Sequence, residues 1–150
     1  MRALAFEDFA VGDEYAPPAR TVTEADVVAF AGVSGDSNPV HTDAVFAAGT
    51  PFGERIAHGL LGLAMAGGFL SRAGVVDGTA IALLGVEWSF RAAVRFGDTL
   101  VPSIRVVEAR PTSDGDRGIV TFAFRLTNQD GALVQEGRHV FMVRRREASA

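Results

Sequence analysis

The second half of the chain is organised in apolar segments with strand-like patterning. Four such segments follow one another: "TAIALLGVEWSF", "DTLVPSIRVVEA", "RGIVTFAFRLT" and "GALVQEGRHVFMVR". In the third, apolar residues alternate with a second set of residues at every other position. The apolar set is Val120, Phe122, Phe124 and Leu126, and the second set is Thr121, Ala123, Arg125 and Thr127. Alternation with a period of two predicts a strand with one buried and one more exposed face.

Short connections separate these predicted strands. Gly97-Asp98 and Asp130-Gly131 indicate tight turns, and the second pair is typical of a hairpin. The connection "RPTSDGDRG" is longer and polar. Successive strands with short connections predict an antiparallel sheet.

The first half of the chain has helical patterning. "ARTVTEADVVAFAGVSGD" predicts a strand that leads into a helix, with Thr23 as its N-cap and an end between positions 32 and 35. The apolar stripe of this helix is formed by Val27, Val28, Phe30 and Ala31. "TDAVFAAGTPFG" predicts a short helix that Gly49 and Pro51 end.

The segment "IAHGLLGLAMAGGFLSRAG" is apolar around its whole circumference between positions 60 and 70. A surface helix has one apolar face only, so this pattern predicts a buried helix. Its glycines each weaken a helix by up to about 1 kcal/mol, a cost that closely packed neighbouring backbone would offset. One buried helix and a sheet able to wrap it predict an α+β domain.

Length and composition restrict the class of protein. At 150 residues and 48% hydrophobic content, we expect one domain spanning residues 1–150. The start lacks the layout of a secretory signal and no run is long enough to span a bilayer, which predicts a soluble cytoplasmic protein without a membrane partner. A net charge of −4 argues against a nucleic-acid partner. With no cysteine in the chain, thiolate ligands and a cysteine nucleophile are excluded.

Every one of the fourteen basic residues is arginine, and three of them form the run Arg144, Arg145 and Arg146 near the C-terminus. We interpret this run as a solvated tail, with a phosphate contact as the weaker alternative.

The candidate chemistry lies in "SGDSNPVHTD", residues 34–43. Asp36 and His41 stand five residues apart in a segment that Pro39 kinks, so both can reach one water molecule. An imidazole with a pKa near 6.5 suits proton transfer at neutral pH, and the carboxylate can exchange the other proton. Further along, His58 and Gly59 open the apolar helix, whose first N–H groups suit a developing oxyanion.

These residues carry a specific resemblance. "FAGVSGDSNPVHTDAVFA" followed by "ERIAHGLLGLAMAGGFLSR" resembles the hydratase signature of MaoC-like dehydratases, the R-specific enoyl-CoA hydratase family, and "VEWSFRAAVRFGDTL" is similar to the segment that follows there. The resemblance covers most of the chain. It implies the hot-dog fold, in which an antiparallel β-sheet wraps one long buried helix, and a homodimer or higher homo-oligomer.

The resemblance also implies the roles of individual residues. Asp36 and His41 would activate a water that adds to C3 of a trans-2-enoyl thioester, and the reverse reaction would dehydrate an (R)-3-hydroxyacyl thioester. The backbone N–H of Gly59 would form the oxyanion hole, and Asn38 would hold the loop and the Asp36–His41 pair in register. A CoA or acyl-carrier-protein thioester is the implied substrate, with no cofactor and no metal.

Some hydratases of this family carry a serine on the helix near the positions of Gly67 and Gly68. The glycines here would widen the pocket for a bulky or branched acyl group, while Ser71 is one turn away.

Structural roles are expected for several neighbouring residues. Asp43 is the expected cap of the short helix, and His58 is an expected structural part of the start of the apolar helix. A metal site at Asp36, His41 and His58 is disfavoured because the sequence has no closely spaced ligand pair. Trp88 and Phe90 are expected in the core or a dimer interface, with the lining of an acyl tunnel as the alternative.

Two other functions stay open at this point. Hot-dog proteins include thioesterases, in which water attacks C1 of the thioester. An acyl-thioester-binding subunit of a heteromeric dehydratase is the non-enzymatic alternative, but such a subunit needs neither Asp36 nor His41.

Overall fold

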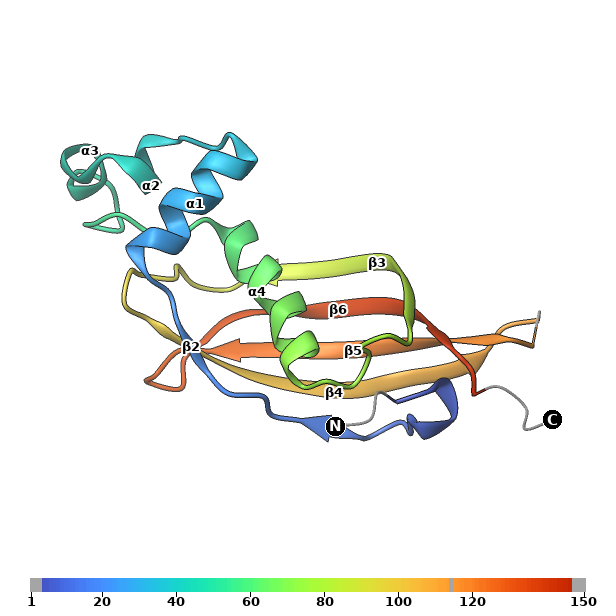
Figure 1. Cartoon of the computed structure of the whole chain (residues 1–150). Coiled ribbons are helices and arrows are strands. Elements are labelled where there is room, and N and C mark those ends of the chain that lie inside the picture. The colour runs from blue at the N-terminus through green and yellow to red at the C-terminus, as the bar shows by residue number, and fades with distance from the viewer. Residues whose placement is uncertain (1–3, 114, 147–150) are drawn as a thin grey trace.

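The computed structural model describes residues 4–113 and 115–146 (Figure 1). Three short elements and four α-helices precede the long strands in the first half of the chain. They are η1 (Phe6–Asp8), β1 (Glu14–Tyr15), β2 (Arg20–Thr21), α1 (Glu24–Ser34), α2 (Pro39–Thr42), α3 (Ala44–Ala48) and α4 (Gly59–Arg72). The second half supplies the long strands β3 (Ala80–Phe90), β4 (Thr99–Pro111), β5 (Arg117–Thr127) and β6 (Leu133–Arg144).

The strands form an antiparallel sheet in the order β1-β4-β5-β6-β3, with β2 also paired to β4. The four predicted strands are therefore confirmed, and β5 has the bounds that the alternation indicated. Gly131 has a φ of 79° in the β5–β6 connection, a conformation that glycine adopts without steric cost. The Asp130-Gly131 hairpin is thus also confirmed.

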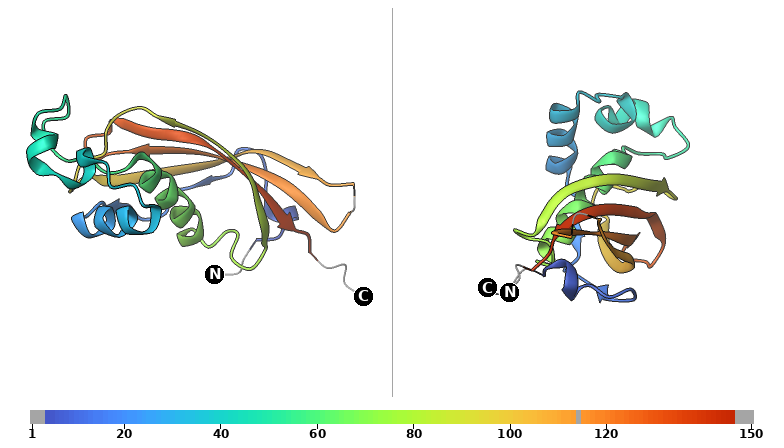
Figure 2. Two further views of the ribbon diagram at one scale, coloured as in Figure 1. Left: turned by 90° about the horizontal axis from the view of Figure 1, so that it is seen from above. Right: turned by 90° about the vertical axis from the view of Figure 1, so that its right-hand side faces the viewer.

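The core lies between α4 and the sheet, which curves around the helix in Figure 2. The inward residues of β5 are at most 1% exposed; they are Val120, Phe122, Phe124 and Leu126. From α4, Leu61, Met65 and Phe69 face them with exposures of 8%, 5% and 1%. Burying such side chains contributes about 1.5–3 kcal/mol each, so this layer is what fixes α4 on the sheet. The predicted α+β class is confirmed.

The helix α4 is less enclosed than its composition predicts. Leu60 is 57% exposed, and Ala64 and Gly68 also lie on the exposed side. A single sheet covers only one side of a helix, so the opposite side stays uncovered. Nothing lies within 4 Å of a Cβ built on Gly67 or Gly68, so the expected close packing of backbone is wrong at these two positions.

The helix α1 begins and ends as predicted, but its buried face is narrower than the predicted apolar stripe. Thr23 accepts the N–H of Asp26, whose carboxylate accepts the N–H of Thr23 in return, and Gly35 ends the helix with a φ of 75°. Val27 is 1% exposed whereas Val28 is 62% exposed, so the predicted stripe is wrong at Val28. The reason is that α1 lies at the outer side of the molecule beside the start of α4, with α2 and α3 projecting past the end of the sheet, so no layer of the described chain covers its outer face (Figures 1 and 2).

The strand β3 is an edge strand with an apolar exposed side. It pairs with β6 on one side, and no strand within residues 4–113 and 115–146 pairs with its other side. Ile81, Leu84 and Phe90 are 46%, 50% and 53% exposed. Exposed apolar edges of this kind are candidates for pairing with another chain.

A histidine lies in the aromatic part of the core. His139 on β6 is 3% exposed, and neither ring nitrogen has a hydrogen-bond partner among the described residues. The ring centroids of Phe124, Trp88 and Phe141 lie 4.4, 5.3 and 6.3 Å from that of His139. Burial lowers the pKa of His139 from 6.5 to about 4, because the imidazolium would lose its hydration without gaining a partner.

This lowered pKa predicts a loss of stability in mild acid. Below pH 6.5 His139 is protonated in the unfolded chain but stays neutral in the folded chain. The free energy of unfolding therefore decreases as the pH is lowered from about 7 to about 4, and His139 has no effect on it above about pH 7. Between pH 7.5 and 5.5, His139 should account for a decrease of about 1.4 kcal/mol in the free energy of unfolding. Urea denaturation of wild type and His139→Phe at both pH values measures it. Equal pH dependence in the two proteins would contradict the assignment.

Candidate active site

The segment between α1 and α3 folds around the side chains of Asp36 and Asn38. A carboxylate oxygen of Asp36 accepts the backbone N–H of Asn38 at 3.2 Å. The amide oxygen of Asn38 accepts the N–H of Val40 at 3.2 Å and so caps α2, in which Pro39 is the first residue. Beyond the kink that the sequence predicted, Pro39 thus begins the single turn of α2, which carries His41.

The orientation of His41 is set by a backbone carbonyl. Its Nδ1 lies 2.8 Å from the carbonyl oxygen of Ile56. A carbonyl oxygen only accepts, so Nδ1 carries the proton and Nε2 of the neutral ring keeps its lone pair. His41 is therefore held as the tautomer that can take a proton at Nε2.

The second histidine of the site supports the first. His58 is 2% exposed, and its Nε2–H donates to the carbonyl oxygen of Asp36 at 2.9 Å. The rings of His41 and His58 lie 3.8 Å apart at an interplanar angle of 31°. The imidazole of His58 thus holds the backbone of Asp36 and also packs against His41, in agreement with its expected structural role. Asp43 caps α3 as expected, accepting the N–H groups of Val45 and Phe46.

The three titratable side chains come together although His58 follows His41 by seventeen residues in the sequence. One ligand atom from each of Asp36, His41 and His58 lies within 4.8 Å of the others. Nδ1 of His58 is buried without a hydrogen-bond partner among the described residues. Two imidazoles and a carboxylate are a donor set that divalent transition metals accept. Ligands that are not closely spaced in the sequence are therefore no obstacle to a metal here, because the fold brings them together; the absence of a metal stays a prediction.

The start of α4 lies beside a hollow of about 350 Å³ that Ile56, Gly59, Phe90 and Gln135 help to line. Gly59 is the first residue of α4, and its N–H finds no backbone acceptor within the described ranges. Phe90 covers it from β3, with ring carbons 3.0 Å from where a Cβ of residue 59 would be. Asp36 and His41 do not line this hollow themselves. Their link to it is Ile56, whose carbonyl holds His41.

One side chain at this helix start was not expected from the sequence. Gln135 of β6 is 1% exposed, and its Nε2 donates to the carbonyl oxygen of Gly59 at 3.1 Å. Its Oε1 accepts the indole N–H of Trp88 at 3.0 Å. The sequence did contain a signal for it, a glutamine inside the apolar strand "GALVQEGRHVFMVR". A buried side-chain amide needs hydrogen-bond partners for both its oxygen and its nitrogen, so such a residue is expected to bind neighbouring groups.

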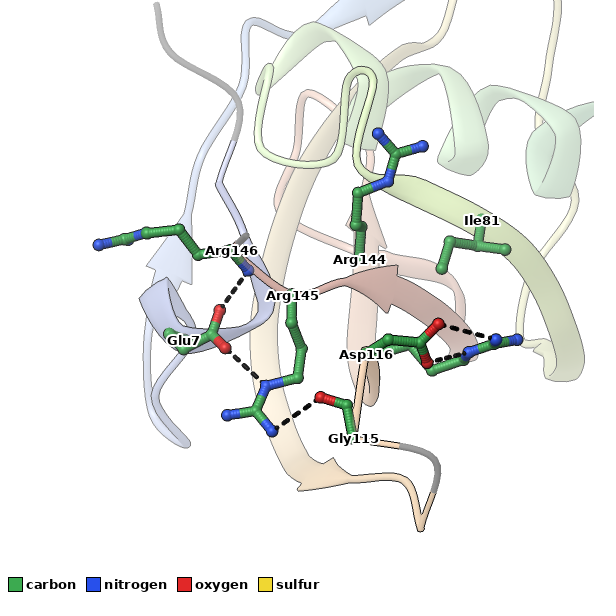
Figure 3. A pocket seen from close by; sticks show the side chains of 8 residues that line it. Glu7, Ile81, Gly115, Asp116, Arg144, Arg145 and Arg146 are labelled. Atoms are coloured by element: carbon green, nitrogen blue, oxygen red, sulfur yellow. Dashed lines mark hydrogen bonds and ion pairs between the residues drawn. The ribbon is translucent and has the colours of Figure 1, made fainter. Parts of the chain in front are cut away.

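A second hollow of about 710 Å³ lies at the opposite end of β3, beside Ile81 (Figure 3). Arg145 pairs with Glu7 at 2.6 Å, Arg146 pairs with Asp8, and Arg144 ends β6. The hydrogen bond from Arg145 lowers the pKa of Glu7. Arg144 and Arg146 are solvent-exposed, as predicted. The run is nevertheless not a free tail, because Arg144 belongs to β6 and the other two arginines tie the C-terminal segment to η1.

Comparison with known proteins agrees with this architecture. Residues 8–124 match the family model described as MaoC like domain. The (R)-specific enoyl-CoA hydratase of Rhodospirillum rubrum is 36% identical over 92% of this chain and 90% of its own. The 3-hydroxybutyryl-CoA dehydratase of Methylorubrum extorquens is 38% identical over 74% of this chain and 69% of its own. The chain belongs to the MaoC-like family.

Solved structures superimpose closely on this chain. The MaoC-like dehydratase from Rhodospirillum rubrum gives a TM-score of 0.87 at 32% identity, over 97% of this chain and all of its own. A Mycobacterium tuberculosis protein with a double hot-dog fold gives 0.84 at 20% identity, over 99% of this chain and 46% of its own. The predicted hot-dog fold is confirmed, and so is the predicted class of enzyme, a hydro-lyase. Within the described part of this MaoC-like chain, no helix has the length and apolarity needed to cross a membrane.

Two glycines of α4 provide a matched test of the contact with Gln135. A Cβ at Gly62 would lie 2.4 Å from Nε2 of Gln135, which is held at both ends and cannot swing away freely, whereas a Cβ at Gly68 meets nothing. We expect Gly62→Ala to lower the free energy of unfolding by about 1–2 kcal/mol through overpacking, although alanine is the better helix former. Gly68→Ala should raise it by about 0.5–1 kcal/mol. Urea denaturation decides, and two equally stable variants would show that Gln135 is free to move.

Proposed function

We propose that the protein hydrates trans-2-enoyl thioesters to (R)-3-hydroxyacyl thioesters and catalyses the reverse dehydration. The observation that carries the proposal is the tautomer of His41, fixed by the carbonyl of Ile56 so that Nε2 is available as a base next to Asp36. The (R)-specific enoyl-CoA hydratases of Rhodospirillum rubrum and Aeromonas caviae, each 36% identical to this chain, support the choice of reaction.

In the proposed mechanism, one water bridges Asp36 and His41. Its oxygen adds to C3 while one of the two side chains takes its proton, and a proton is delivered from the pair to C2, so the elements of one water molecule are added in total. The thioester oxygen gains negative charge during the addition, and the Gly59 N–H donates to it. A donor of this kind contributes about 3 kcal/mol to transition-state stabilisation.

Asn38 has an indirect role in this mechanism. Its N–H holds the Asp36 carboxylate and its side-chain oxygen caps the turn that carries His41, so it fixes both members of the pair at once. Asn38 need not touch the substrate to be required.

The substrate in this proposal is a CoA or acyl-carrier-protein thioester, and the reaction needs no cofactor. The hollow beside Gly59, of about 350 Å³, has room for part of the thioester, whose reacting carbons would lie between Gly59 and the Asp36–His41 pair. A homodimer through the apolar edge of β3 belongs to the same proposal, as does a cytoplasmic location. Pairing of two β3 edges would cover Ile81, Leu84 and other exposed apolar side chains of that strand.

Hydration of crotonyl-CoA, followed by the loss of enoyl-thioester ultraviolet absorbance, tests the proposal. The wild type should turn the compound over, and Asp36→Asn and His41→Ala should each lower kcat/KM by at least about 100-fold, because each removes a proton-transfer group. Chiral analysis of the product should find the (R) isomer. Wild-type activity retained in either variant would remove the mechanism.

Two controls separate this reaction from the alternatives. Release of free CoA thiol, measured in the same samples, would indicate a thioesterase instead. Val28→Ala changes an exposed side chain of α1 outside the site and should keep the wild-type rate. Binding of CoA thioesters of several lengths with no turnover in either direction would indicate a binding subunit.

A further inference from the structure

The start of α4 lacks the anchor that a helix normally has. Its N-cap, His58, makes no side-chain cap bond to α4, and its Nε2 is engaged with the carbonyl oxygen of Asp36 instead. Gly59 follows, a residue with no side chain that could fix its own backbone. An oxyanion donor must nevertheless be preorganised, because reorienting it during the reaction would cost the stabilisation that it provides.

Gln135 supplies the missing anchor from the sheet. Its amide N–H donates to the Gly59 carbonyl at 3.1 Å, and its position opposite Phe90 in the β3–β6 register places both residues beside Gly59. Gly59 is thus held through its carbonyl by Gln135 and covered by the Phe90 ring.

The amide of Gln135 is itself oriented by a second residue of β3. The indole N–H of Trp88 on β3 donates to Oε1, which leaves Nε2 facing Gly59. If the amide were rotated by half a turn, an oxygen would face the Gly59 carbonyl and a nitrogen would face the indole N–H, and both bonds would be lost. Gly62 completes the arrangement, since any side chain there would occupy the place of the amide.

We propose that Gln135, oriented by Trp88, is a positioning residue that holds the Gly59 N–H in place for the thioester oxygen. The proposal rests on the function proposed above and adds two residues to it. Gln135 acts through Gly59, so its removal should affect the transition state more than the binding of substrate.

The test compares Gln135→Met, which keeps the volume but not the hydrogen bonds, with the wild type. In crotonyl-CoA hydration we expect kcat to fall by about 10- to 100-fold with KM within about twofold. Trp88→Phe should lower kcat less, because Gln135 keeps its bond to Gly59. The double variant should be no slower than Gln135→Met alone, since Trp88 acts only through Gln135.

A matched control separates positioning from loss of stability. Val120→Ala removes buried methyl groups from β5 far along the sheet and destabilises the core without touching Gln135 or Gly59. It should keep the wild-type kcat. A Gln135→Met variant with wild-type kcat, or additive losses in the double variant, would overturn the proposal.

A spectroscopic readout does not depend on turnover. In the Asp36→Asn background, the carbonyl stretching frequency of bound crotonyl-CoA, measured by infrared difference spectroscopy, should lie below that of the free thioester because the Gly59 N–H polarises it. Adding Gln135→Met should remove most of this shift. An unchanged shift would contradict the role of Gln135 and leave the hydratase function standing, whereas an inactive wild type would contradict both.

Discussion

The packing of α4 against the sheet is the constraint on which the site depends. Leu61, Met65 and Phe69 are buried on the inner face of the sheet, and their burial fixes where the first turn of α4 lies. Because those anchors follow Gly59 by two to ten residues on one rigid helix, the backbone N–H groups at the helix start have a defined position relative to β3 and β6. The chemistry is therefore placed at the end of an element that is stabilised elsewhere.

The catalytic segment has a different kind of support. Asp36, Asn38 and His41 lie beyond the end of the sheet, with few buried apolar contacts, and their geometry comes from hydrogen bonds with one another and with Ile56 and His58. Each of these bonds contributes only about 1 kcal/mol to stability. Their value is in orientation: they determine which nitrogen of His41 carries the proton and which way the Asp36 carboxylate faces.

Much of this was predictable from the sequence, for physical reasons. The period-two alternation of Val120, Phe122, Phe124 and Leu126 determined β5, and Thr23 with Asp26 determined the start of α1. The pattern of apolar residues predicts which segments are helical but not how much of each helix its neighbours cover. Leu60 and Val28 were therefore wrongly expected to be buried. The approach of His58 to Asp36 and His41 also depends on tertiary contacts that no local spacing reveals. Gln135 was missed because an apolar pattern identifies a buried strand without saying what its polar members bind.

Gln135 shows why a polar residue is kept in such a core. Replacing a buried, fully hydrogen-bonded side chain by an apolar one of the same shape can be nearly neutral for stability, so stability alone does not explain a glutamine that is 1% exposed. His139, four residues further along β6, is also buried but has no partner for its ring nitrogens among the described residues, and its burial is compensated by aromatic packing alone. The two residues thus differ in what their polar atoms do. The ring nitrogens of His139 have no hydrogen-bond partner among the described residues. The amide atoms of Gln135 connect β6 to Trp88 of β3 and to the first residue of α4. A side chain with two directional bonds of this kind defines the position of a backbone carbonyl more sharply than apolar contacts can, and the carbonyl that it defines is that of Gly59.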